Sequence, residues 1–162
     1  MALSESIKRL QFPVSRLRTG TPPRLSNKTI DYSQLEADPG DEKITWFSFL
    51  NGFKDYKMQQ GKITCYLTRT NSKTHEIILS NYHQAPVLGE NEFGYGIGPR
   101  YCPSIEKKLL TFTDKESHTI WLEPEGHNSD IVYPNGISTG LPYSVQEDFV
   151  RSIKGLENAT IL

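Results

Sequence analysis

The residue types best suited to chemistry lie in residues 94–112, where a glycine-rich run leads to a cysteine. Glycines at every second position from 94 to 98 let the backbone turn tightly and approach a ligand with no Cβ in the way. Pro103 is typical of the first position of a helix, and Ile105 and Leu109 have the spacing of an inward face. The pattern therefore predicts a short helix over 104–112 that begins directly after the glycine-rich run.

Cys102 would then lie at the start of this helix, two residues after Arg100. Unpaired backbone N–H groups and the helix dipole favour negative charge at such a place. They lower the pKa of a thiol and make the thiol a nucleophile, and the same geometry also suits a phosphate. The alternative is a glycine-rich turn into a surface helix, with a buried and unreactive cysteine.

The other residues that form disulfides or bind metals are too sparse for either role. Two cysteines, Cys65 and Cys102, make neither a disulfide framework nor a zinc quartet, and they favour a reducing compartment. Cys65 lies in an alternating stretch over 63–69, on the face with Ile63 and Leu67, and is best interpreted as a buried structural thiol. The histidines lack the spacing of a zinc site, so we expect no metal.

A basic run near the N-terminus is the second candidate for ligand binding. Six Lys or Arg side chains and no acidic one lie between Ser6 and Ile30, although the net charge of the whole chain is −1. Two adjacent prolines before Arg24 hold its backbone extended, so the side chain is presented stiffly. The run could contact an anionic ligand, and the alternative is a solvated face.

The elements that would position these residues form a mixed α/β or α+β fold, and we expect a mixed sheet with short helices. A chain of 162 residues, 36% of them hydrophobic, suits a single domain. No apolar run is long enough to span a membrane, and no signal peptide is recognisable. Helices are predicted over 3–10, 72–82, 104–112 and 144–153, and strands over 13–17, 63–69, 118–123 and 130–133.

Five ordered motifs closely resemble the glucose-inhibited division protein A family over nearly the whole chain. They are 19–24 (TGTPPR), 71–76 (NSKTHE), 98–106 (GPRYCPSIE), 122–126 (LEPEG) and 133–138 (YPNGIS). The resemblance implies the flavin subunit of an enzyme that, with a partner GTPase, attaches a carboxymethylaminomethyl-type group at carbon 5 of the tRNA wobble uridine. It also implies FAD, recharging of the flavin by NADH, a carbon supplied by methylene-tetrahydrofolate, and a homodimer.

The resemblance also assigns roles to residues of this sequence. Cys102 corresponds to the family's essential cysteine, and with Arg100 it is a candidate catalytic residue towards uridine. Arg16, Arg18 and Arg24 become candidate contacts to cofactor or tRNA phosphate. The nicotinamide-binding stretch corresponds to Gly98, Pro99, Arg100, Tyr101, Cys102, Pro103, Ser104, Ile105, Glu106, Lys107, Lys108, Leu109, Leu110, Thr111 and Phe112.

Several departures from the family limit this transfer. Lys107 stands where the family usually has Asp, and Arg69 where it usually has His. The family's FAD-binding fingerprint and its C-terminal helical region have no counterpart in 1–162. The chain is therefore expected to be a single inserted substrate and NADH domain, inactive alone, from a mitochondrial member or alternatively a bacterial cytoplasmic one.

Two further interpretations remain beside this one. The first is a non-catalytic module that binds a nucleotide or a protein partner. The second is the methylene-tetrahydrofolate-dependent methyltransferase relative of the same flavin superfamily, against which the 98–102 block (GPRYC) argues.

Overall fold

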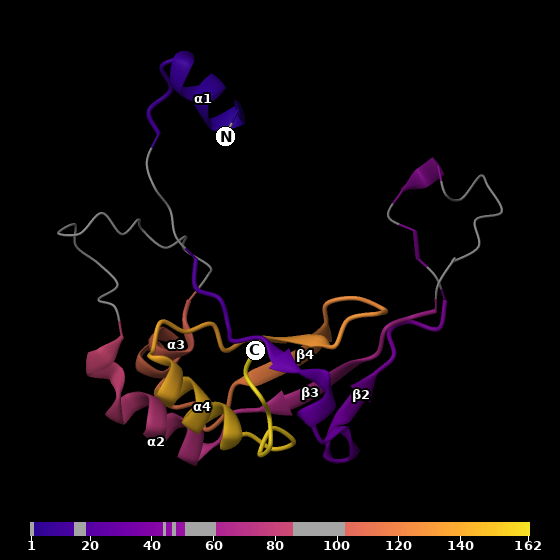
Figure 1. The fold of residues 1–162 in the computed structure, drawn as a ribbon, viewed down its shortest axis with the longest axis vertical. Coiled ribbons are helices and arrows are strands. Elements are labelled where there is room, and N and C mark those ends of the chain that lie inside the picture. Colours follow the sequence, from indigo (N-terminus) through magenta and orange to yellow (C-terminus); the bar gives the residue numbers. More distant parts are fainter. Residues whose placement is uncertain (1, 15–18, 44, 47, 51–60, 86–102) are drawn as a thin grey trace.

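The computed structural model describes residues 2–14, 19–43, 45–46, 48–50, 61–85 and 103–162. Within them, five strands form one sheet in the order β1-β5-β4-β3-β2, and α2, α3 and α4 gather on one side of it (Figure 1). The predicted mixed α/β class is confirmed. The strands are β1 (Leu25–Ser26), β2 (Glu36–Asp38), β3 (Cys65–Arg69), β4 (Thr119–Pro124) and β5 (Ile131–Asn135). The helices are α1 (Ala2–Arg9), α2 (Ser72–Ser80), α3 (Ile105–Thr111) and α4 (Tyr143–Arg151), with 3-10 turns η1 (Asn27–Thr29), η2 (Tyr32–Gln34) and η4 (Tyr82–Gln84).

The strand pairings among the described residues are all antiparallel, whereas the sequence suggested a mixed sheet. A single helix between two strands commonly gives a parallel pair, because it returns the chain to the end of the sheet where the first strand began. Here both α2 and α3 lie between β3 and β4. The chain therefore enters β4 at the end where β3 stops, with Arg69 opposite Thr119.

The core lies between the sheet and the three helices, as expected for an antiparallel sheet with one buried face. Ile120 and Leu122 of β4 are fully buried, and Ile105 and Leu109 of α3 pack into the same cluster. Each such side chain contributes about 1.5–3 kcal/mol on burial, so this cluster is the main support for α3. The apolar stripe predicted for 144–153 is confirmed, with Val145, Phe149, Val150 and Ile153 all buried.

The buried face of β3 differs from the prediction. Alternation suggested that Cys65 and Leu67 face the core, but Tyr66 packs against the core and Thr68 is only 5% exposed. The neighbouring strand decides the face, because the pairing sets Tyr66 opposite Leu122. Cys65 is half-buried rather than buried. Burial raises the pKa of the Cys65 thiol, and the carboxylates of Glu123 and Asp38 raise it further.

The N-terminal segment contributes little to the core. α1 forms close to its predicted position, but none of its residues is buried. The strand predicted over 13–17 falls partly on 15–18, outside the described residues, and Pro13 and Val14 do not lie in a strand. No helix in the described part of the chain is both long and apolar enough to cross a lipid bilayer.

Candidate functional site

Part of the predicted site lies outside the described residues. The ranges 15–18 and 86–102 contain the catalytic candidates and two of the three basic candidates. What the structure places is the remainder, namely residues 103–112 and Arg24. The residues outside are Arg16, Arg18, Gly98, Pro99, Arg100, Tyr101 and Cys102.

The start of α3 is capped by a serine. Ser104 has extended backbone, and its side chain accepts a hydrogen bond from the Lys107 N–H at 3.3 Å. Pro103 therefore precedes the N-cap and is not the first helical residue, as the sequence had suggested. The Ile105 N–H, which has no partner within the helix, donates to the Ser138 carbonyl at 2.7 Å. The helix start is thereby joined to the segment that follows β5.

Glu106 makes the strongest connection between α3 and that segment. Its side chain is 1% exposed, and its Oε1 accepts hydrogen bonds from the Thr139 hydroxyl and, at 3.0 Å, from the Gly140 N–H. Its Oε2 is buried and has no hydrogen-bond partner among the described residues. A buried carboxylate is costly unless its oxygens are satisfied, so one half of this group is compensated and the other half is not.

Gly136 completes the connection between α3 and the end of β5. The Lys108 Nζ donates to its carbonyl at 2.7 Å. Gly136 has a φ of +117°, and a Cβ there would lie 2.6 Å from the Thr119 carbonyl oxygen. Only glycine fits this turn without displacing backbone, so the sequence pattern Pro-Asn-Gly is required by the close approach of β4.

The described part of the predicted nicotinamide-binding stretch has a buried set and an exposed set of side chains. Ile105, Glu106 and Leu109 are buried and hold the helix against the body of the protein. A ligand at this helix would meet the other set, on its outer face. These exposed residues are Lys107, Leu110, Thr111 and Phe112.

Arg24 is held by four contacts at the edge of the sheet. Its Nε lies 2.5 Å from Oε1 of Glu125, and its NH1 donates to the Thr21 hydroxyl at 2.7 Å and to the Pro22 carbonyl at 3.1 Å. Its guanidinium stacks over the ring of Tyr133, 4.4 Å from the centroid. The side chain is stiffly presented, as predicted, but its charge is already balanced by a carboxylate.

Contacts link four of the five sequence motifs to one another. The 19–24 motif pairs with the segment after β5 through the bridge between Thr21 and Thr139, and reaches the 122–126 motif through Arg24. The described end of the 98–106 motif contacts the 133–138 motif through Ile105. The fifth motif, 71–76, lies at the start of α2.

The start of α2 is closed by a network of neutral groups. Asn71 and Thr74 form a reciprocal capping box, and the Asn71 amide donates to the Ser152 carbonyl at 2.7 Å. Beside it, His75 Nε2 lies 2.8 Å from the Thr70 hydroxyl oxygen, which also accepts the His118 N–H. Motif 71–76 thus connects α2 to α4.

His118 was not singled out by the sequence, because it looked like the first residue of a strand. It is 8% exposed, its Nε2 has no partner among the residues that the structure describes, and its ring centroid lies 5.7 Å from that of His75. Burial lowers the pKa of both imidazoles, and for His118 the charges of His75, Lys108 and Lys115 lower it further. Within the described residues, no group of His, Cys, Asp and Glu could hold a metal ion.

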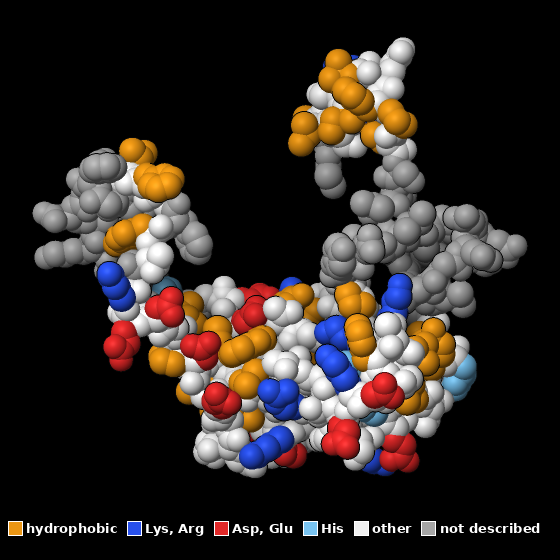
Figure 2. Space-filling view, turned by 180° about the vertical axis from the view of Figure 1, so that it is seen from behind, with side chains coloured by type: hydrophobic (Ala, Val, Ile, Leu, Met, Phe, Trp, Pro, Cys, Tyr) orange, Lys and Arg blue, Asp and Glu red, His pale blue; other side chains and the backbone are white. Residues whose placement is uncertain are grey.

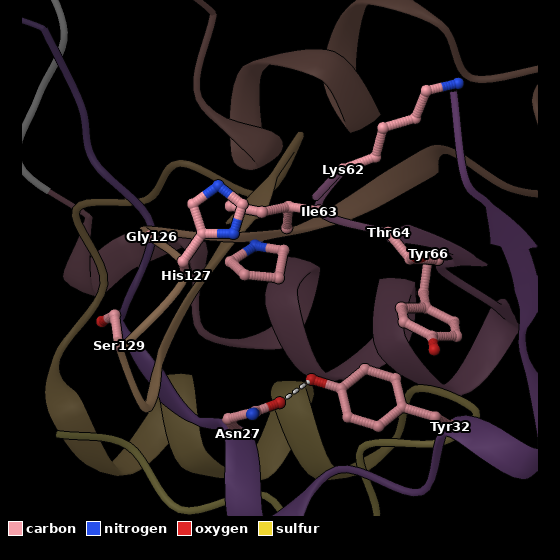
Figure 3. Close-up of a pocket in the computed structure, with 10 residues that line it drawn as sticks. Asn27, Tyr32, Lys62, Ile63, Thr64, Tyr66, Gly126, His127 and Ser129 are labelled. Atoms are coloured by element: carbon pink, nitrogen blue, oxygen red, sulfur yellow. Dashed lines mark hydrogen bonds between the residues drawn. The ribbon is translucent and has the colours of Figure 1, made fainter. Parts of the chain in front are cut away.

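A second feature missed by the sequence is a cavity between β3 and the β4–β5 turn (Figure 3). Two tyrosine rings, Tyr32 and Tyr66, contact each other there with their centroids 4.3 Å apart. Periodicity could not reveal this cavity, because the two rings lie 34 residues apart in the sequence. They come together only through the folding of the chain, in which β2 pairs with β3.

Charges of both signs are interspersed on the surface. On the face seen in Figure 2, Lys and Arg side chains lie among Asp and Glu side chains over the body of the protein. Several form exposed ion pairs, such as Lys28 with Asp130 and Arg151 with Glu147, which add little stability. Binding to an anionic ligand would therefore depend on local arrangement rather than on a broad basic surface.

Comparison with known proteins adds a family to this geometry. The sequence model described as "Glucose inhibited division protein A" matches residues 1–162. Two relatives from Streptococcus suis, strains 05ZYH33 and 98HAH33, are each 51% identical over 162 residues, which is 100% of this chain and 25% of theirs. Both are named tRNA uridine 5-carboxymethylaminomethyl modification enzyme MnmG. The chain thus spans about a quarter of the length of these curated relatives.

Solved structures agree with this match. The form I crystal structure of Aquifex aeolicus GidA is similar with a TM-score of 0.79 and 46% identity, over 98% of this chain and 27% of that one. The form II crystal structure gives a TM-score of 0.76 and 44% identity, over 99% of this chain and 25% of that one.

Proposed function

The chain belongs to the glucose inhibited division protein A family, and from this premise we propose that it is part of an enzyme that modifies the tRNA wobble uridine at carbon 5. The observation that carries the proposal is 51% identity along the full chain to relatives named for that modification. Contacts that link four of the sequence motifs support it, because Arg24 with Glu125 and Ile105 with Ser138 join segments far apart in the sequence.

The proposed chemistry needs groups that this chain does not supply alone. We propose that FAD is held mainly by other parts of the complete protein, since 1–162 has no G-x-G-x-x-G fingerprint after a strand. FAD supplies electron-transfer chemistry when bound, NADH reduces it, and methylene-tetrahydrofolate supplies the carbon. A partner GTPase and a homodimeric assembly belong to the same proposal.

The contribution of this chain is to position a ligand beside α3. The outer face of the helix, including Lys107 and Phe112, is available to a nicotinamide dinucleotide, while Glu106 fixes the inner face through Thr139. Lys107 would add a positive charge near ligand phosphates. A helix with a fixed inner face and an exposed outer face supports the assignment of the 98–112 stretch to cofactor binding.

Cys102 is the proposed catalytic group towards uridine, as nucleophile or as acid and base, with Arg100 stabilising negative charge. Cys65 is the natural comparison, because burial and two carboxylates raise its pKa and keep it a neutral thiol. The two cysteines should therefore respond differently to the same substitution.

The test is wobble modification by the complete gene product, measured by mass spectrometry of nucleosides from tRNA. Cys102→Ser should abolish the modification, and Cys65→Ser should leave most of it. If the Cys102 variant modifies tRNA as well as the wild type does, the catalytic role is wrong.

A further inference from the structure

The cavity between β3 and the β4–β5 turn has about 390 Å³ of space, within the range of small-ligand pockets. It lies at the β4–β5 turn, at the opposite end of β5 from the segment that contacts α3. Its walls come from η1, η2, the approach to β3 and the turn itself. Four separate segments of the chain thus meet around one hollow.

Aromatic rings form one side of this cavity. Tyr32 and Tyr66 are half-buried and tilted by 42° to each other, and Figure 3 shows their rings together on one side of the opening. The Tyr32 hydroxyl donates to Oδ1 of Asn27, which fixes that ring. The Tyr66 hydroxyl makes no hydrogen bond to another described residue. The cavity therefore offers preorganised ring faces and a hydroxyl still able to donate.

Lys62 brings a positive charge to the lining of the cavity. Lys62 and His127 line it and are exposed, and no carboxylate belongs to the described residues that line it. Figure 3 shows His127 across the opening from the tyrosines, with Lys62 reaching outward. Burial, followed by the neighbouring Tyr66, raises the pKa of Tyr32 to about 12, so its hydroxyl stays neutral. An anionic group beside Lys62 would meet no carboxylate among the described residues that line the cavity.

We propose that this cavity binds one nucleotide, with the base against the tyrosine rings and the phosphate near Lys62 and His127. Aromatic faces with nearby cations are how proteins bind unstacked bases, because stacking accepts any base and the cation takes its phosphate. The proposal rests on the proposed function, which brings two sources of nucleotides to this protein. One is a loop of the tRNA, and the other is the adenosine half of the dinucleotide.

Photo-crosslinking of the complete gene product distinguishes the two sources. An RNA stem-loop carrying 5-iodouridine and, separately, an azido-adenine analogue of NADH are irradiated with the protein, and labelled peptides are mapped by mass spectrometry. Label from the RNA on Tyr32 or Tyr66 supports the site and identifies tRNA as its source. Label from the NADH analogue supports the site and identifies the dinucleotide. Label from neither overturns the proposal.

Affinity measurements with matched variants test the same proposal in solution. Lys62→Ala with His127→Ala should weaken binding of the RNA stem-loop or of NADH at low salt, and should reduce the salt dependence of that binding by about one phosphate contact, that of Lys62. The control is Lys154→Ala with His83→Ala, another exposed lysine and histidine that do not line the cavity. Equal effects of the two pairs would overturn the site.

Wobble modification is measured on the same preparations. Modification without crosslinks in the cavity would remove the nucleotide site and leave the proposed function intact. Crosslinks in the cavity without modification would support the nucleotide site and contradict the proposed function.

Discussion

The starts of α2 and α3 look alike locally but differ in how their polar groups are satisfied. Both have a polar N-cap, Asn71 in one and Ser104 in the other, and both are tied to a distant segment. At α2 the ties run through neutral groups, with Thr74 and Ser152 sharing a hydrogen bond of 2.7 Å. At α3 the ties include a buried carboxylate, Glu106, with one oxygen bonded and the other without a partner in the described part of the chain.

This difference distinguishes contacts that serve stability from contacts that position a helix for another role. A neutral network with its bonds made costs little to bury and stabilises the docking of two helices. A buried carboxylate with an open oxygen is expensive, and a packed neutral side chain would serve stability better. The open oxygen of Glu106 is the observation on which we propose a positioning role for the start of α3, beside the 98–102 stretch.

The largest expected effect comes from removing the Glu106 side chain. Glu106→Ala leaves the Thr139 hydroxyl and the Gly140 N–H without their acceptor and opens a cavity, so the free energy of unfolding should fall by about 3 kcal/mol. Chemical denaturation measures the loss.

Glu106→Gln is the matched control for that loss. Its amide oxygen can still accept both hydrogen bonds, and it removes the charge, so we expect unfolding free energy equal to the wild type or slightly higher. If Gln is as damaging as Ala, the carboxylate is required for stability itself, and the contrast between the two helix starts fails.

A smaller effect is expected at α2. Asn71→Ala removes the side-chain oxygen that accepts the Thr74 N–H and the amide that donates to the Ser152 carbonyl. The free energy of unfolding should fall by about 1–2 kcal/mol. Asn71→Asp keeps the cap but loses the amide donor, and should recover part of that loss. A loss at Asn71 larger than the loss in Glu106→Ala would reverse the expected order.

The smallest effect is a dependence of stability on pH near α2. Burial holds the pKa of His75 and His118 below the ordinary value of 6.5, so the unfolded chain binds protons that the folded chain does not. Stability is therefore full above pH 6.5 and is lost as pH falls below that value towards the lower pKa of the folded state.

The histidine contribution is isolated by comparing variants. Denaturation of the wild type and of His118→Gln between pH 7.5 and pH 5.5, a range of about one unit on either side of that value, should show a weaker pH dependence in the variant. Identical pH profiles would show that the pair does not contribute.

The sequence was informative where one segment decides its own environment. The stripe on α4 was predictable, because Val145, Phe149 and Val150 have helical spacing and must face the core wherever the helix packs. Pro103 and Ser104 predicted the short helix after the glycine-rich run, and its predicted ends lie within two residues of those of α3. Motif order predicted the family, and with it the region of interest.

The sequence was less informative where a distant segment decides. The face of β3 was misassigned because Cys65 and Leu67 alternate as plausibly as Tyr66 and Thr68, and only pairing with β4 selects between them. Glu106 was not among the residues expected to face inward, and its side chain bonds Thr139, 33 residues later. β1 and β2 have two and three residues, too short for any period to appear.

The central claim is that the start of α3 serves chemistry and the start of α2 serves stability. The most direct measurement is the extent of wobble-uridine modification in tRNA by the complete gene product carrying Cys102→Ser or Asn71→Ala, below the unfolding temperature of both. The account predicts a stable Cys102 variant without modification and a less stable Asn71 variant that modifies tRNA nearly as the wild type does. Modification by the Cys102 variant, or its loss in a folded Asn71 variant, would contradict it.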